Sequence, residues 1–433
     1  MFLYPLSSTY KDHSLIVALC DVSRIRMQYF DDKLRADYSY PDPIALYHAD
    51  EFDRLLREQK PDVVIVTSVD ATHADYIVPS LHAGCDVIVE KPIAVSVGQL
   101  AAIERAARAT GRSVRVAFNC RWFPSAKAVW DLIAAKEIGE VCHVHFEYLL
   151  DTSHGADYFR RWHARMEHSG GLLVHKSTHH FDLVNWWLDS IPETVSANGR
   201  LAFYGKENAI ARGDERWTRY DRYLDPASQG DPFRIDLLEN GRNILYHEAE
   251  ADSGYIRDRN VFRDDVDIYD TMSVIAKYRS GALLTYSLMA YSPYEGFRVS
   301  FTGDRGRLEF LESRGTDLIT GQGDSEEAKR KAAVPDSSRT SEIRIQKHFG
   351  EMRRIPVPEA EGGHFGADPL LQEQLFSPDP PADGAHRAAG WEQGFASAML
   401  GISANHSIAT GKTVCLNDLL PIRPDALKLS ELV

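Results

Sequence analysis

The chain has 433 residues, of which 44% are hydrophobic and 26% are charged, and its formal net charge at pH 7 is −14. This length and composition suit two or three globular domains and exclude wholesale disorder. The acidic balance argues against nucleic acid or an anionic membrane surface as the main partner. No apolar run reaches the length of a membrane span, and residues 1–10 lack the pattern of a secretory signal. The five cysteines have neither zinc nor redox spacing, so we expect free thiols in a reducing cytoplasm.

The first 120 residues alternate short apolar runs with helical patterns. Strands are predicted at 15–20, 62–67, 86–90 and 113–118, and helices at 50–59, 72–83 and 96–111. Continuous Val and Ile runs between helices indicate a parallel sheet that is covered on both faces. The expected fold class is α/β, with a doubly wound, Rossmann-like sheet in this part of the chain.

The tripeptide Glu90-Lys91-Pro92 ends the third of these predicted strands. In open α/β sheets, ligands bind outside the carboxyl ends of the strands. A lysine held there and partly desolvated has a lowered pKa and can move protons. An ordinary surface lysine after a strand is the alternative interpretation of this motif.

A glycine pair at 170–171 introduces a predicted helix that runs from Leu172 to about Leu188. Helical spacing places four side chains on one stripe of it: His175, His179, Asp182 and Trp186. Proton-competent groups on an otherwise apolar helix are costly if they are buried without a task. Together with the lysine motif, the stripe favours chemistry over a satisfied core helix.

A metal site on His175, His179 and His180 is the alternative to this interpretation. Two histidines at i and i+4 occur in some zinc helices. Here no glutamate follows the first histidine, and no distal third ligand is evident. We therefore expect no metal.

Four ordered stretches of the chain closely resemble the Gfo/Idh/MocA family of oxidoreductases: 67–73, 83–92, 119–124 and 170–182. The resemblance covers roughly 10–310 and the C-terminal helix near 385–411. It implies a dinucleotide-binding domain at 1–120, followed at 121–433 by an α+β domain with a large open antiparallel sheet. A C-terminal helix at 387–410 would pack back on the core, and the open sheet would form a homodimer or homotetramer.

The resemblance also implies an NAD-dependent oxidoreductase that acts on a hydroxyl of a sugar, polyol or cyclitol. Lys91 and His179 match the family's catalytic lysine and histidine. Asp21 matches the acidic residue that grips the adenosine ribose and favours NAD over NADP. Further positions where the family contacts the cofactor or shapes the nicotinamide pocket are Thr67, His73, Glu90 and Arg121.

Two departures from the family pattern stand out. His175 occupies the place of an aspartate, which removes a fixed negative charge but leaves a group that can exchange protons. The family's first strand and Gly-x-Gly-x-x-Gly turn are missing, because the chain begins in what looks like the following helix and its first glycine is Gly84. Loss of that central strand would leave its neighbours unpaired. A misassigned start or truncation, a natural loss with weak or no dinucleotide binding, and a partner chain that fills the gap are all open.

The second domain opens with a predicted helix at 127–135 and an alternating strand at 141–148. The loop that follows is rich in groups that line carbohydrate sites. Our candidate substrate residues there are Tyr158, Arg161, Trp162 and His163, joined by Asp182 on the helix. A structural loop packed by Tyr158 and Trp162 is the alternative.

The rest of the chain offers weaker signals. The polar run 204–263 looks like an insertion over the pocket or an oligomer contact, and Tyr255 and Asp267 could reach substrate. Strands expected at 272–278, 283–291, 298–302 and 308–310 are separated by short turns, which indicates an antiparallel sheet. A mobile loop is expected at 321–341, and a turn or substrate loop at 362–368.

The hypothesis is that hydride leaves a carbinol carbon for nicotinamide while Lys91, with His179 and His175 beside it, takes the hydroxyl proton. Redox-neutral cleavage of glycosides by the same fold is one alternative. A non-catalytic sugar-binding or cofactor-free protein is the other, because the glycine fingerprint is absent.

Overall fold

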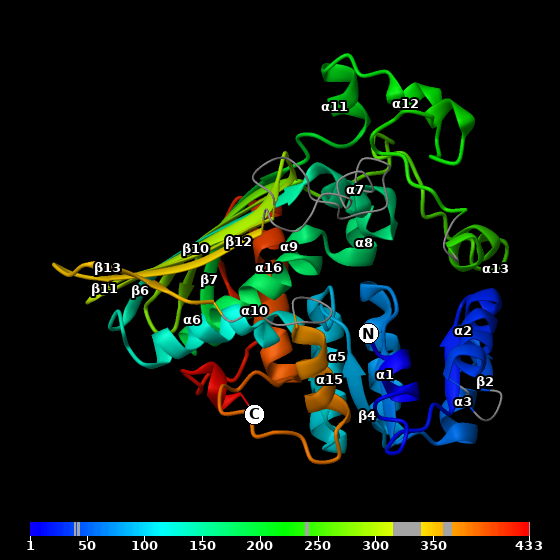
Figure 1. The fold of residues 1–433 in the computed structure, drawn as a ribbon, viewed down its shortest axis with the longest axis horizontal. Helices are drawn as coiled ribbons and strands as arrows, with labels where there is room; N and C mark the ends of the chain where they lie inside the picture. Colours follow the sequence, from blue (N-terminus) through cyan, green and yellow to red (C-terminus); the bar gives the residue numbers. More distant parts are fainter. Residues whose placement is uncertain (39, 41–43, 239–241, 315–338, 358–365, 433) are drawn as a thin grey trace.

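The computed structural model describes residues 1–38, 40, 44–238, 242–314, 339–357 and 366–432. The loop expected at 321–341 and the glycine-rich stretch at 362–368 lie for the most part outside the described residues. Figure 1 shows the large sheet on one side of the molecule and the N-terminal domain on the other.

The parallel strands of the N-terminal domain form two separate sheets in the described residues. Strand β1 (Ala18–Asp21) pairs with β2 (Ala45–His48), and β3 (Val63–Val66), β4 (Asp86–Val89) and β5 (Val114–Val116) pair in that order. A short C-terminal strand, β14 (Ala389–Gly390), adds antiparallel to β5. The expected Rossmann-like pattern is confirmed, and the split between β1 and β3 lies where that pattern has its central strand.

Helices flank these strands, and all of them except α1 and α2 match helices expected from the sequence. They are α1 (Leu3–Ser7), α2 (Arg24–Tyr38), α3 (Phe52–Gln59), α4 (His73–His82) and α5 (Val97–Thr110), with short 3-10 turns η1 (Ala49–Glu51) and η2 (Asp70–Thr72). The sequence pattern does not indicate α2, because only Met27, Asp31 and Leu34 of its fifteen residues are buried. The apolar stripe that reveals a helix is therefore too thin to read.

The C-terminal domain is built on a nine-stranded sheet in the order β13-β12-β11-β10-β6-β9-β8-β7-β15. Its strands are β6 (Val141–Asp151), β7 (Pro192–Arg200), β8 (Thr271–Tyr278), β9 (Leu283–Ser292), β10 (Glu295–Gly303), β11 (Gly306–Arg314), β12 (Arg339–Lys347), β13 (Met352–Ile355) and β15 (Val414–Cys415). All neighbours are antiparallel except β6 and β9, which run parallel. The large sheet that we expected is therefore present and is mixed.

Side chains alternate along this sheet, and its buried face carries the core. Phe146 on β6 faces Tyr286 on β9 and Val299 on β10, and all three are fully buried. Helices cover that face (Figure 1): α6 (Pro124–Ala134), α9 (Leu172–His175), α10 (Ser177–Leu188) and α16 (Trp391–Thr410). Helix α16 contacts both β7 and α5, so it ties the two domains together.

The helix predicted at 172–188 is in fact two helices, α9 and α10, which break at Lys176. The amide of His179 donates to the Lys176 carbonyl, three residues back, where a continuous α-helix would use the His175 carbonyl four residues back. His175 and His179 therefore stand on different helices. The glycine turn before α9 is as predicted, with φ of +66° at Gly170 and +72° at Gly171.

The polar insertion at 204–263 is a packed structure. Its short elements are α11 (Lys206–Ala211), α12 (Arg216–Arg219), η5 (Pro226–Ser228), η6 (Asn243–Glu248) and α13 (Glu250–Ser253). Buried aromatic rings hold it to α7 (Thr152–Arg160), as Phe159 stacks on Tyr204 with centroids 4.0 Å apart. Its far end lies against α2 (Figure 1), where Arg26 Nε donates to the Leu245 carbonyl at 2.8 Å. The remaining elements are η3 (Asn119–Trp122), η4 (Trp162–Ala164), α8 (Met166–Ser169), α15 (Ala367–Phe376), α17 (Leu416–Leu419) and η8 (Leu429–Glu431).

Candidate active site

Lys91, just beyond the carboxyl end of β4, meets the junction of α9 and α10. Its Nζ donates to the carbonyl of His175 at 3.0 Å. This carbonyl is available because the helix breaks there and His179 bonds elsewhere. The break and the lysine contact thus satisfy one another, and they hold the strand tip against the histidine helix.

A carboxylate that the sequence does not single out completes this contact. Asp70, the first residue of η2, places Oδ2 at 2.6 Å from Nδ1 of His175, and both side chains are nearly inaccessible. Burial raises the pKa of Asp70 well above its usual value. Burial, followed by the charge of Lys91, lowers the pKa of His175 well below its usual value. Both shifts disfavour isolated charges, so we assign one shared proton to this short bond.

The predicted substrate loop packs its rings around His175. The His175 ring centroid lies 4.3 Å from His163, 5.5 Å from Tyr158 and 5.7 Å from Trp162. Arg161 lies beside them and its side chain keeps 27% of its surface exposed. The segment that we predicted as a loop is in fact helical, with Tyr158 on α7 and Trp162 and His163 on η4. The structure thus brings these residues and Arg161 to one place with His175, Asp70 and Lys91.

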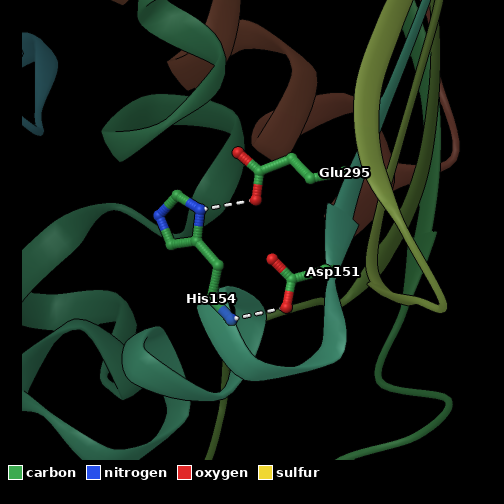
Figure 2. A group of neighbouring side chains, drawn as sticks. All are labelled: Asp151, His154 and Glu295. Carbon is green, nitrogen blue, oxygen red and sulfur yellow. Dashed lines mark hydrogen bonds and ion pairs between the residues drawn. The ribbon is translucent and has the colours of Figure 1, made fainter. Parts of the chain in front are cut away.

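Behind Tyr158 lies a polar group formed by Asp151, His154 and Glu295, shown in Figure 2. His154 Nδ1 is 2.8 Å from Glu295 Oε2, and its Nε2 is 3.3 Å from the Tyr158 hydroxyl. The three residues offer atoms within 4.8 Å of one another, a spacing that can hold a metal ion. These hydrogen bonds do not require a metal ion. A neutral His154 can donate from Nδ1 to Glu295 and accept at Nε2 from the Tyr158 hydroxyl. The group then orients the Tyr158 ring toward His175.

Two predicted site residues pair with each other instead of facing a ligand. Arg121 and Asp182 form two bonds of 2.6 Å and are fully buried, and Ser397 Oγ donates to Asp182 at 3.1 Å. Arg121 also donates to Gln393 on α16 at 2.8 Å. The predictions of Asp182 as a substrate residue and Arg121 as a cofactor contact are therefore not retained, because both side chains are saturated in the core.

His73 is likewise buried, and each of its ring nitrogens lies near a backbone carbonyl. Nδ1 lies 2.8 Å from the Pro92 carbonyl and Nε2 lies 3.2 Å from the Ser68 carbonyl. Burial lowers the pKa of His73 to about 4, so the ring is neutral near pH 7 and only one nitrogen donates. His73 therefore fixes the backbone next to Lys91, which is a different role from the cofactor contact that we predicted.

The other predicted cofactor residues stand at strand ends. Asp21 ends β1, Thr67 follows β3 and is exposed, and Glu90 follows β4. Asp21 Oδ1 accepts from the Ser23 amide at 2.8 Å and lies 3.5 Å from Arg26. The insertion adds a second carboxylate here, since Asp252 accepts from the Ile25 amide at 3.0 Å. These positions suit the ribose and nicotinamide ends of a dinucleotide, while a glycine turn for the pyrophosphate is absent from the sequence.

The two remaining histidines diverge. His179, in the first turn of α10, is half-buried, and its ring lies 6.3 Å from that of Phe118. His180 points into the core, where Nδ1 is 2.8 Å from the Tyr286 hydroxyl and burial lowers its pKa well below the usual value.

Two cavities differ in their relation to this cluster. One of about 690 Å³ lies at the amino ends of β3 and β4, near Asp62 and Asp86, and is remote from Lys91. The other, of about 350 Å³, is lined by Arg161 and Trp162 and adjoins the His175 cluster. Asp70 could have been found from sequence as an acidic side chain after β3, at the same sheet edge as Lys91.

Comparisons with known proteins agree with the two-domain fold. Residues 3–118 match the model of the oxidoreductase family with an NAD-binding Rossmann fold, GFO_IDH_MocA, and residues 131–416 match the model of its C-terminal alpha/beta domain. YteT of Bacillus subtilis (strain 168), whose name places it among the oxidoreductases, is 35% identical over 98% of this chain and 96% of its own. The scyllo-inositol 2-dehydrogenase (NAD(+)) of the same organism is 26% identical over 34% of this chain and 41% of its own.

Solved structures share the fold at low identity. The aldose-aldose oxidoreductase from Caulobacter crescentus, complexed with glycerol, superimposes with a TM-score of 0.59 at 15% identity, over 96% of this chain and 95% of its own. None of the helices in the described ranges is long and apolar enough to cross a bilayer.

Proposed function

The chain belongs to the Gfo/Idh/MocA family of oxidoreductases, and from that premise we propose that it is an NAD-dependent enzyme acting on a hydroxyl of a sugar, polyol or cyclitol. The observation that carries the proposal is the joint contact of Lys91 and Asp70 with His175. It supports a lysine at a strand tip working beside a carboxylate–imidazole pair.

The side chains divide the proton transfer between them. Lys91 donates a hydrogen bond to the reacting hydroxyl oxygen and stabilises the negative charge that grows as hydride leaves. His175 takes the hydroxyl proton, and Asp70 stabilises the imidazolium across their 2.6 Å bond. His179, four residues further along and on α10, contacts a second hydroxyl of the substrate, next to the reacting one. This assignment places the family's aspartate function on Asp70 acting through His175.

NAD, when bound, supplies the hydride acceptor. Asp21 would hold the adenosine ribose, and Thr67 and Glu90 would face the nicotinamide end. Asp252 of the insertion and Asp21 both bond to backbone amides at the start of α2. Two carboxylates at this helix end repel a 2′-phosphate, so we propose a preference for NAD over NADP.

Redox-neutral cleavage of glycosides is the second candidate. A relative named as a glycosyl hydrolase family 109 protein, from Solibacter usitatus (strain Ellin6076), is 26% identical over 58% of this chain and 60% of its own. Transient oxidation would acidify a neighbouring C–H bond, and the same base would serve.

The experiment is titration of NAD into the full chain, followed by a panel of sugars, polyols and glycosides monitored by nicotinamide absorbance. We expect NADH to form, and Lys91→Met to lower kcat by about 10²- to 10⁴-fold. Lys127→Met is a matched control, because Lys127 is partly exposed and pairs only with Asp131 on its own helix among the described contacts. Release of an aglycone without net NADH would favour the second candidate. Absence of both NAD binding and turnover would reject both and favour a sugar-binding protein.

A further inference from the structure

The cavity of about 350 Å³ beside the His175 cluster is strongly basic. It lies between the segment 160–168 and the end of the insertion at 254–265, and five arginines line it: Arg160, Arg161, Arg165, Arg259 and Arg263. Only two carboxylates, Glu167 and Asp265, line it with them. Such a concentration of guanidinium groups is unusual in a chain whose net charge is −14.

The carboxylates near this cavity are fewer than the arginines. Arg165 lies 3.5 Å from both Glu167 and Asp267. Asp265 is shared by Arg259, at 2.9 Å, and Arg263. Behind the wall, Asp157 is shared by Arg160 at 2.9 Å, and by Arg161 and Arg257 at 3.6 Å each. The three guanidinium groups hold the pKa of Asp157 far below its usual range despite its burial. Arginine cannot release its proton, so among the described residues a positive surplus persists.

The surplus reaches the candidate catalytic groups. Trp162 lines the cavity and stacks on His163 with ring centroids 3.6 Å apart. After burial, the charge of Arg161 is the largest cause that lowers the pKa of His163, and it also contributes to the lowered pKa of His175. A molecule bound in the cavity would lie against Trp162, whose ring centroid is 5.7 Å from that of His175.

From these contacts we infer that the cavity is the subsite for an anionic group of the substrate, which is a carbohydrate bearing a carboxylate or a phosphate. The inference rests on the proposed function and narrows its substrate class. Arginine forks bind carboxylate and phosphate oxygens in pairs, and the rings of Trp162 and Tyr255 offer faces for a sugar. The volume suits a monosaccharide unit.

The test measures binding to the full chain without NAD, by calorimetry, for three ligands: galacturonate, galactose 6-phosphate and galactose. We expect one of the anionic ligands to bind at least about tenfold more tightly than galactose, and the tighter one identifies the group. Arg161→Gln and Arg259→Gln should each weaken binding of that anion about tenfold, and Arg259→Gln should leave the affinity for galactose unchanged. Arg54→Gln, an exposed arginine on α3 that pairs with Glu51 and Glu58, is the matched control.

Equal affinity for all three ligands would overturn the inference, and so would unchanged anion affinity in a folded Arg259→Gln protein. Arg259 serves as the second variant because its side chain is 43% exposed and its loss is the less disruptive. Selective anion binding without any NAD-linked turnover would support the subsite and reject the oxidoreductase. Turnover of neutral sugars with no anion preference would support the oxidoreductase and reject the anion subsite.

Discussion

Asp70 and Asp182 are both buried carboxylates with a bonded partner, and they differ in what the partner can do. Asp182 meets Arg121 through two bonds of 2.6 Å and takes a third from Ser397. Asp70 bonds to one ring nitrogen of His175, Nδ1, next to Lys91. An arginine does not give up its proton, whereas an imidazole does so near neutrality. The bonded partner therefore distinguishes the two aspartates: Asp182 has a structural role, and we expect a chemical role for Asp70.

The largest expected effect is on stability, through Arg121→Met. It leaves the Asp182 carboxylate buried without its counter-charge, which should lower the free energy of unfolding by about 3–5 kcal/mol. Urea unfolding followed by circular dichroism measures it. The double variant Arg121→Met with Asp182→Leu should recover most of the loss, because no charge is left buried. A stable single variant with abolished turnover would instead show that this pair takes part in the chemistry.

Asp70→Asn should act on turnover, with little effect on folding. Asparagine can bond to the ring of His175 but cannot stabilise its protonated form, so we expect kcat to fall about 10²-fold. The wild-type profile of kcat/KM should fall only below pH 6.5, because burial lowers the pKa of His175 and its base form persists as the pH drops.

Steady-state rates from pH 5 to 8 give the pH profile of the wild-type enzyme and the kcat of Asp70→Asn. The control is Asp75→Asn, an exposed carboxylate on α4. An Asp70→Asn enzyme that retains wild-type kcat would remove the distinction between the two aspartates.

The smallest effect should come from Ser397→Ala. It removes one hydrogen bond to Asp182 and leaves the arginine in place, so the cost should be about 1 kcal/mol with kcat unchanged. Ser403→Ala on the same helix is the matched control, because Ser403 Oγ is buried and has no bonding partner among the described residues. Equal losses in the two variants would mean that the bond to Asp182 contributes nothing.

Much of the fold could be predicted because its signals are local. Val and Ile runs reveal β3 and β4, and a clean amphipathic pattern with Ser96 and Gly111 at its ends marks α5. The break at Lys176 could not be predicted, because the residues around it favour a continuous helix. It depends on Lys91 binding the His175 carbonyl and on α16 packing close to α9. A Cβ at Gly401 would come within 2.3 Å of the Leu173 carbonyl, so that approach requires glycine.

Local patterns were enough to predict the parallel α/β arrangement, the lysine at the end of β4 and the histidines after a glycine turn, since periodicity and turn residues act over a few positions. Two contacts become visible in the folded chain alone: Asp70 faces His175, 105 residues away, and three arginines share Asp157. Contacts between distant segments produce no periodic pattern in the sequence. Several basic side chains can also pair with the same carboxylate, so the sequence does not show which pairs form. Asp182, which we predicted to contact substrate, instead forms a buried ion pair with the distant Arg121.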